Sequence, residues 1–145
     1  MGLELGDLNV GTSLPESKRR VTQEHINLYA EASKDFNPIH IDPEFARRAG
    51  LDGTIAHGML ILAYISEFMT GNFGQAWFTG GSLSARFKAP ARPDDTITVS
   101  GKVTGVQREK GGVLIDCDVL CRNQQDEPVI ICETKVRVRT DEDSD

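Results

Sequence analysis

Apolar and polar residues alternate with a period of two through the second half of the chain, from Trp77 onward. The alternation is clearest in four runs, over residues 83–87, 97–103, 115–121 and 130–138. Turns are expected at Gly105, at Gly111-Gly112 and between Asn123 and Pro128. A period of two is typical of strands that bury one face. The pattern therefore predicts a long antiparallel sheet with one dry face and one wet face.

The first half of the chain follows a helical spacing instead. Thr22 is a typical N-cap, and apolar residues then recur at helical intervals up to about Ser33. The pair Asp42-Pro43 and the later Gly50 predict a shorter helix over residues 44–49. Upstream of both helices, residues 11–21 predict an edge strand whose basic side chains discourage further pairing.

Residues 56–69 form the most apolar segment of the chain, with Ser66 and Glu67 as its interior polar residues. Such a segment predicts a helix that is buried on most sides. Gly71, Asn72 and Gly74 are expected to end it. One buried helix followed by a long run of strands predicts an α+β fold, in which a curved antiparallel sheet wraps around a central helix.

Length and charge narrow the class of protein. A chain of 145 residues suits one domain, which we expect over residues 1–140, followed by an acidic and disordered tail over residues 141–145. The formal net charge of −6 argues against nucleic acid or an anionic membrane as the main partner. The longest apolar run, residues 59–65, is too short to span a bilayer, and no signal peptide is recognisable.

The three cysteines, Cys117, Cys121 and Cys132, show no CxxC spacing and each falls in a predicted strand. Buried free thiols in a reducing cytoplasm are the expectation. The histidines His25, His40 and His57 form no metal-binding motif, so no metal site is predicted.

The segment from Asp35 to His40 carries the most promising chemistry. Pro38 fixes its own φ and keeps Asn37 out of helical geometry, so the chain should turn here. A carboxylate and an imidazole on the two sides of such a turn can face one small volume, as an acid–base pair acting on one water must. The segment by itself also fits an Asx-type turn with a structural histidine, so both interpretations stay open.

Several motifs together resemble the MaoC-like hydratases, the (R)-specific enoyl-CoA hydratases or hydratase 2, which have a hot-dog fold. The motifs are Asp-x-Asn-Pro-x-His at residues 35–40, His-Gly-Met at residues 57–59, Phe-Lys-Ala-Pro at residues 87–90 and the Leu-Gly-Asp lead-in at residues 5–7. The resemblance implies that residues 56–70 are the central helix of a hot-dog fold. It also implies a homodimer or larger homo-oligomer, with an acyl tunnel near the seam between two protomers.

By position, the resemblance implies that Asp35 and His40 are the catalytic pair. Asn37 matches the asparagine of the family motif, which orients the carboxylate or the substrate amide, or serves only the turn. Gly58 matches the glycine whose amide binds the thioester carbonyl. Ser66 matches a helix serine near the catalytic water, with a core hydroxyl as the alternative.

Other side chains keep two interpretations each. His57 is either catalytic or a positioning and capping residue, and Glu67 is either a thioesterase-type acid or a surface or paired carboxylate. Arg86 and Lys88 are the candidates for contacts with the CoA phosphates, together with Arg47, Arg48 and Arg92, or they belong to solvated faces. Large apolar residues wall either the core or an acyl pocket; these are Met59, Phe68, Met69, Phe73, Trp77 and Phe78.

The resemblance predicts an enzyme that adds water across the trans-2 double bond of an enoyl thioester to give (R)-3-hydroxyacyl-CoA, reversibly. The substrate would be carried by CoA or by acyl-carrier protein, and no further cofactor is expected. A hot-dog acyl-CoA thioesterase and a non-catalytic acyl-CoA binding module are the alternatives.

Overall fold

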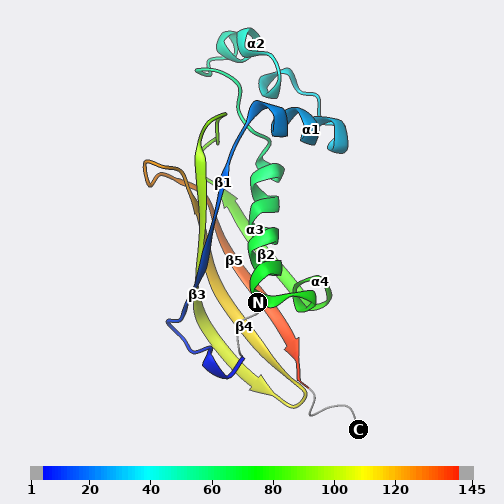
Figure 1. Cartoon of the computed structure of the whole chain (residues 1–145), viewed down its shortest axis with the longest axis vertical. Coiled ribbons are helices and arrows are strands. Elements are labelled where there is room, and N and C mark those ends of the chain that lie inside the picture. The colour runs from blue at the N-terminus through cyan, green and yellow to red at the C-terminus, as the bar shows by residue number, and fades with distance from the viewer. Residues whose placement is uncertain (1–4, 141–145) are drawn as a thin grey trace.

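Five antiparallel strands curl along one side of a long helix in the computed structural model, which describes residues 5–140 (Figure 1). The strands are β1 (Ser13–Arg20), β2 (Gly81–Phe87), β3 (Thr96–Glu109), β4 (Gly112–Arg122) and β5 (Pro128–Arg139), in the order β1-β3-β4-β5-β2. The helices are η1 (Leu5–Asp7), α1 (Gln23–Ser33), η2 (Pro38–His40), α2 (Pro43–Arg48), α3 (Gly58–Phe73) and α4 (Gln75–Gly80). The predicted α+β architecture is confirmed.

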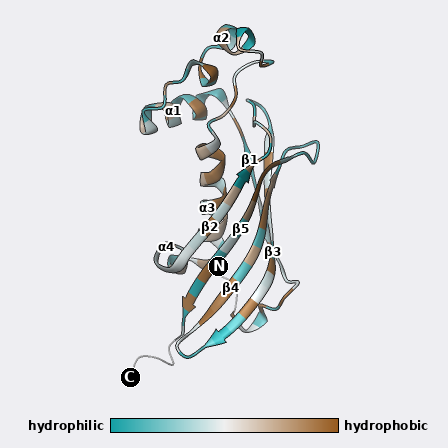
Figure 2. Ribbon diagram, turned by 180° about the vertical axis from the view of Figure 1, so that it is seen from behind, coloured by the Kyte–Doolittle hydropathy of each residue, from teal (hydrophilic) through white to brown (hydrophobic). Residues whose placement is uncertain are grey.

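The core lies between α3 and the sheet. The buried residues of α3 recur at helical spacing along one side; they are Ile61, Tyr64, Ile65, Phe68, Met69 and Asn72. They meet the inward positions of the strands, which alternate with exposed ones, as in the pattern of β5. Figure 2 shows this alternation as bands of apolar and polar colour along the strands. Each fully buried aliphatic side chain stabilises the fold by about 1.5–3 kcal/mol, so this contact fixes α3 against the sheet.

The three cysteines are free and belong to this core. Burial raises the pKa of Cys117 to about 11, of Cys121 to about 12 and of Cys132 to about 11. The prediction of buried free thiols is therefore confirmed.

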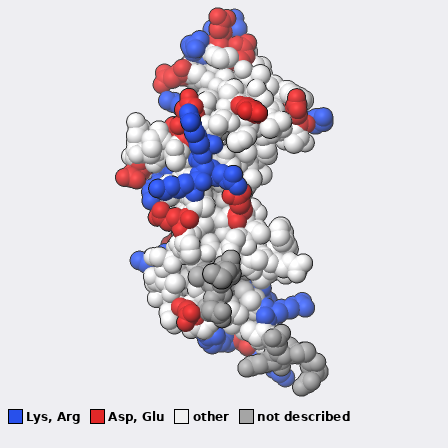
Figure 3. Space-filling view, in the orientation of Figure 1, with Lys and Arg blue, Asp and Glu red and all other residues white. Residues whose placement is uncertain are grey.

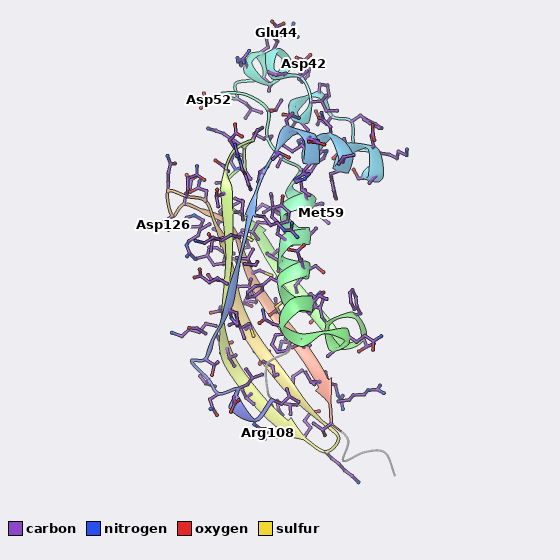
Figure 4. All side chains as sticks on the ribbon, in the orientation of Figure 1. Asp42, Glu44, Asp52, Met59, Arg108 and Asp126 are labelled. Carbon is purple, nitrogen blue, oxygen red and sulfur yellow. The ribbon has the colours of Figure 1, made fainter. Side chains whose placement is uncertain are left out.

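One side of α3 is exposed, and the outer edges of β1 and β2 have no strand partner among residues 5–140. Met59, Ala63, Glu67 and Gly71 lie on the exposed side of α3, where Figure 4 labels Met59 near the first turn. The helix is thus covered less completely than its sequence predicted. Strand β2 pairs with β5 along one edge, and its other edge has no strand partner among residues 5–140.

Three details of the secondary structure differ from the predictions. Helix α3 runs through Gly71 and Asn72 and has its C-cap at Gly74, because its last turns still bury Met69 and Asn72. Trp77, predicted to open the sheet, lies in α4. Gly105, predicted as a turn, lies inside β3 at a shift of the β3–β4 register, where the strand absorbs an extra residue as a bulge.

Caps place the small helices at the end of the molecule where α3 begins (Figure 1). The Thr22 hydroxyl accepts from the His25 amide (3.1 Å) at the start of α1, and Asp42 accepts from the Glu44 amide (3.0 Å) at the start of α2. Lys34 ends α1 with a φ of 65°. These caps return the chain, through residues 35–40, toward the N-terminus of α3.

Basic side chains gather over β1 on the face shown in Figure 3, with acidic groups beside them. Arg19 pairs with Glu67, and Arg20 with Asp94 (2.8 Å). None of the helices within residues 5–140 is long and apolar enough to cross a membrane. The acidic tail, residues 141–145, lies outside the described residues, so the domain boundary at residue 140 stays a prediction.

Candidate active site

His40 is held from several sides at the end of η2, and 7% of the residue is exposed. Its main-chain carbonyl accepts from the Gln23 side chain (2.8 Å), and the Ile55 amide donates to the neighbouring Ile39 carbonyl (3.1 Å). Its Nδ1 lies 2.8 Å from the Ile55 carbonyl oxygen. A carbonyl can only accept, so Nδ1 carries the proton in the neutral ring. This leaves the lone pair on Nε2, which faces Asp35.

Asp35 lies on the outer side of the turn, and 53% of its side chain is exposed. Its Oδ1 accepts from the Asn37 amide (3.2 Å), and the Asn37 side chain in turn accepts from the Ile39 amide (3.2 Å). Asn37 thus caps η2 and shapes the turn, one of its two expected roles. The second oxygen of Asp35, Oδ2, lies 4.0 Å from Nε2 of His40.

The 4.0 Å separation between Asp35 Oδ2 and His40 Nε2 is too long for a direct hydrogen bond and suits one bridging water. A water about 2.8 Å from both atoms would subtend an angle of about 90°, close to the angle between its own O–H bonds. Both atoms are acceptors when the carboxylate is ionised and the ring is neutral. Such a water would donate both protons to the pair and turn its lone pairs away from it.

Gly58 is the first residue of α3, so its amide has no carbonyl of the preceding turn to bond. No hydrogen-bond partner of this amide is found among residues 5–140. A Cβ on Gly58 would lie 2.9 Å from Cε1 of Phe87, so only glycine leaves that ring where it is. Gly58, His40 and Phe87 line one open pocket of about 370 Å³, whose remaining walls are mostly apolar.

His57 lies directly before α3 and is 2% exposed. Its ring stacks on that of His40, with centroids 3.8 Å apart and 26° between the planes, and its Nε2 lies 3.0 Å from the Asp35 main-chain oxygen. The side chain does not cap α3 through a hydrogen bond. Of its two expected roles, this geometry favours the positioning one.

Ser66 stands eight residues beyond Gly58, about 12 Å along the helix axis. Its hydroxyl accepts from the indole N–H of Trp77 (3.0 Å), the partner that a buried tryptophan needs. The structure therefore brings Ser66 to the α3–α4 contact and does not bring it next to Asp35 and His40.

The candidate phosphate-binding residues do not all gather at one place. Lys88 lines the pocket that His40 and Gly58 share, and it also lines a second hollow together with Arg86 and Glu133. Arg92 pairs with Asp52 (3.4 Å). Arg47 and Arg48 end α2 and are exposed. Of this set, only Lys88 is among the residues lining the pocket.

Glu67 accepts from the guanidinium of Arg19 (2.9 Å), and this contact raises the pKa of Arg19. It is therefore the paired surface carboxylate of the two alternatives. The large apolar residues divide between core and surface. Phe68, Met69 and Trp77 are buried and Phe73 packs against them, while Met59 and Phe78 are exposed and none of the six lines the pocket.

Asp35, His40 and His57 bring one ligand atom each within 4.8 Å of one another, a spacing that could suggest a metal ion. The ring geometry does not fit one. An imidazole lone pair lies in the plane of its ring, and two stacked rings direct their lone pairs along separate planes that do not converge on one ion.

Three contributors to the site were missed from the sequence. Ile55 acts through its carbonyl, which carries no sequence signal. Phe87 was assigned to the sheet, although its contact with Gly58 depends on the curl of β2. Tyr29 lies in α1 with its ring centroid 4.8 Å from that of His57, and it belongs to none of the motifs.

Comparison with known proteins agrees with this geometry. Residues 9–119 match the family model described as MaoC like domain. The chain is 32% identical, over 86% of its length and 73% of the relative's, to the mitochondrial 3-hydroxyacyl-acyl-carrier-protein dehydratase of Arabidopsis thaliana. It is 36% identical to the (R)-specific enoyl-CoA hydratase of Aeromonas caviae, over 71% of this chain and 76% of that one.

Solved structures show the same arrangement of elements. The MaoC-like dehydratase of Rhodospirillum rubrum superposes with a TM-score of 0.81 at 27% identity, over 95% of this chain and 97% of that one. The (R)-hydratase of Aeromonas caviae gives a TM-score of 0.76 at 25% identity, over 90% and 96% of the two chains. Sequence, site geometry and fold therefore agree that this chain belongs to the MaoC-like domain family, a hot-dog family whose named members here are hydro-lyases.

Proposed function

We propose that this protein hydrates the trans-2 double bond of an enoyl thioester to give the (R)-3-hydroxyacyl thioester, and catalyses the reverse dehydration. One observation carries the proposal. Asp35 Oδ2 and His40 Nε2 lie 4.0 Å apart, the span of one water, and His40 shares a pocket with the start of a helix whose first amide is free among residues 5–140. Hydration of an enoyl thioester needs both parts, a held water and a donor for the thioester oxygen.

The Gly58 amide would stabilise the charge that develops during attack. When water adds to C3, electrons move through C2 to the thioester oxygen, which becomes an enolate oxygen. A donor aimed at this oxygen acts more strongly on the transition state than on the substrate. Gly58 offers an N–H at the positive end of the α3 dipole, and its missing side chain leaves room for the Phe87 ring, which lines the same pocket.

Asp35 and His40 would handle the water and its proton. The water gives one proton to one member of the pair as its oxygen bonds to C3, and the pair then delivers a proton to C2 as the carbonyl re-forms. Because both events take place at the same pair, H and OH add to the same face of the double bond.

Two alternative functions explain fewer of the contacts. A thioesterase of the hot-dog class would need a carboxylate that directs attack on the thioester carbonyl itself. The candidate on the central helix, Glu67, is already paired with Arg19. A non-catalytic acyl-CoA module would need neither the spacing of Asp35 and His40 nor the tautomer that leaves the His40 lone pair facing the water position.

One assay separates the three functions. Crotonyl-CoA is incubated with the protein while the absorbance of the conjugated double bond and the free thiol are followed together. Hydration lowers the absorbance and releases no thiol. Thiol release supports the thioesterase, and a bound but unchanged substrate supports the binding module; either result rejects the proposal.

CoA or acyl-carrier protein would carry the substrate, as part of the substrate itself, and the proposed chemistry requires no further cofactor. Lys88 at the pocket supports a contact with a phosphate group of either carrier. Replacing Lys88 by Met should raise KM more than it lowers kcat if this contact exists.

We infer a homodimer built through β2. This strand lacks the Lys and Pro residues that protect open edges, and it is exposed at nearly every position. The β1 edge, in contrast, carries Pro15, Lys18, Arg19 and Arg20. Light scattering should give twice the 15.9 kDa of one chain, and a single-chain mass would reject the dimer.

A reducing compartment, such as the cytoplasm, suits the three free cysteines. The Arabidopsis relative is named as mitochondrial, so the compartment of this protein is a separate question, which imaging of a tagged chain answers.

A further inference from the structure

We propose that His57 is the positioning residue of the catalytic pair: it holds Asp35 through a main-chain hydrogen bond and His40 through ring stacking. This inference rests on the hydratase function proposed above and adds a residue that neither binds substrate nor transfers a proton. His57 contacts both residues, which lie on the two sides of the turn. Its Nε2 lies 3.0 Å from the main-chain oxygen of Asp35, and its ring centroid lies 3.8 Å from that of His40.

The turn itself offers Asp35 little other support. Residues 31–38 are all exposed, and even the large apolar Phe36 has 52% of its surface exposed. Within the described residues the hydrogen bonds of the Asp35 side chain and amide go only to near neighbours in sequence, Asn37 and Ser33. The bond from His57 therefore joins this segment to the body of the protein.

His57 is well placed to act as an anchor. The preceding amide, that of Ala56, donates to the Ala91 carbonyl (2.7 Å), and the following residue, Gly58, starts α3. The Tyr29 ring packs against the His57 ring from α1, with centroids 4.8 Å apart. One residue thereby ties the carboxylate, the imidazole and the free amide of the site to the same helix start.

A purely structural role would favour a different side chain. His57 Nδ1 is buried and has no hydrogen-bond partner among residues 5–140. A buried polar atom without a partner is unfavourable, and an apolar ring such as Phe would fill the same space without it. The imidazole is therefore explained by the bond that its Nε2 makes to Asp35.

The two stacked rings hold opposite tautomers. His57 carries its proton on Nε2, because the Asp35 carbonyl can only accept, and His40 carries its proton on Nδ1, because the Ile55 carbonyl can only accept. This arrangement is a spectroscopic signature that can be measured without any substrate.

The test compares His57→Phe, which keeps a ring for stacking, with His57→Gln, whose amide nitrogen occupies the place of Nε2. The exposed His25, replaced by Phe, is the matched control. With crotonyl-CoA we expect His57→Phe to lower kcat about 10²-fold with little change in KM, the loss typical of a misplaced catalytic group. His57→Gln should recover much of that loss, and His25→Phe should behave as wild type.

Wild-type kcat in His57→Phe, or equal losses in the Phe and Gln variants, would overturn the proposal. Long-range ¹H–¹⁵N spectra of the wild-type histidines give an independent decision should the variants fail to fold. A proton on His57 Nδ1 in place of Nε2 would overturn it as well. A wild-type protein that leaves crotonyl-CoA unchanged would instead reject the hydratase function, so the two failures are distinguishable.

Discussion

Replacing Asp35 by Asn changes the water position while preserving the turn around it. The two side chains have the same shape, and the amide oxygen of the variant can still accept from the Asn37 amide, which lies 3.2 Å from Asp35 Oδ1 in the wild type. The group facing His40 changes from an acceptor to a donor, and the His40 lone pair lies 4.0 Å away. At this distance the variant amide does not bond His40 directly, and it can no longer accept a proton from the bridging water, so the water loses one of its two acceptors.

The expected loss follows from this geometry. General acid–base catalysis is worth about 10²–10⁴ in rate, so we expect kcat of Asp35→Asn to fall within that range. The side chain is half exposed and makes one main-chain bond that survives, so the free energy of unfolding should change by less than about 0.5 kcal/mol. This variant should thus lose most of its kcat while its free energy of unfolding stays nearly unchanged.

For His40, the substitution that separates activity from stability in the same way is His40→Asn. The asparagine amide can occupy the place of Nδ1 and keep the bond to the Ile55 carbonyl, while Nε2 is lost. An alanine would leave this buried carbonyl without its partner, which costs about 1–3 kcal/mol and confuses the result. Glu31→Gln, an exposed carboxylate change on α1, is the matched control.

The double variant decides whether the two groups share one water. Residues that act as a unit show strongly non-additive losses, so Asp35→Asn combined with His40→Asn should lose little more kcat than the worse single variant. The assay is the initial rate of crotonyl-CoA hydration at saturating substrate. Losses that multiply would show two independent steps, and a single variant that keeps more than about a tenth of the rate would refute the acid–base assignment.

Three further predictions concern the surroundings of the pair. Gly58→Ala should lower kcat/KM by about tenfold or more, because the added methyl displaces the Phe87 ring. The loss should be smaller in a Phe87→Ala background, and an equal loss in both backgrounds would argue against this contact. Glu67→Gln should leave turnover unchanged and change the free energy of unfolding by about 0–1 kcal/mol in thermal unfolding, since the ion pair with Arg19 is half exposed. A loss of turnover would instead support Glu67 as a catalytic acid. Burial raises the pKa values of the cysteines from 9.0, so the unfolded chain loses its thiol protons at a lower pH than the folded protein does. The free energy of unfolding should therefore fall as pH rises above about 9. Urea unfolding at pH 8 and pH 10 measures this, and equal midpoints would contradict it.

Local sequence rules predicted most of the fold because the elements obey them. The Thr22 and Asp42 caps, the apolar stripe of α3 and the alternation of the strands are all consequences of nearby residues. Gly105 and Trp77 were misassigned because tertiary packing decides their state. A bulge depends on the neighbouring strand, and α4 has too few residues for a periodic pattern.

The motifs could predict candidate site residues only where the chemistry lies in their own residues. Asp35, His40 and Gly58 became candidates in this way; their roles stay predictions, and the structure brings them to one end of α3. The Ile55 carbonyl, the Phe87 ring over Gly58 and the stacking of His57 on His40 depend on segments that meet only in the fold. Ser66 was a candidate from the sequence, but in the structure its hydroxyl accepts from the Trp77 indole in the contact between α3 and α4.

The face on which water adds tests the central claim most directly. Crotonyl-CoA is hydrated in D₂O, and the configuration of the product is determined at C2 and C3. If Asp35 and His40 handle one water, deuterium enters C2 on the same face as the hydroxyl enters C3, and the proposed function expects the (R) configuration at C3. Deuterium on the opposite face would show that the two groups do not serve a single water, and the (S) product would contradict the proposed (R) specificity.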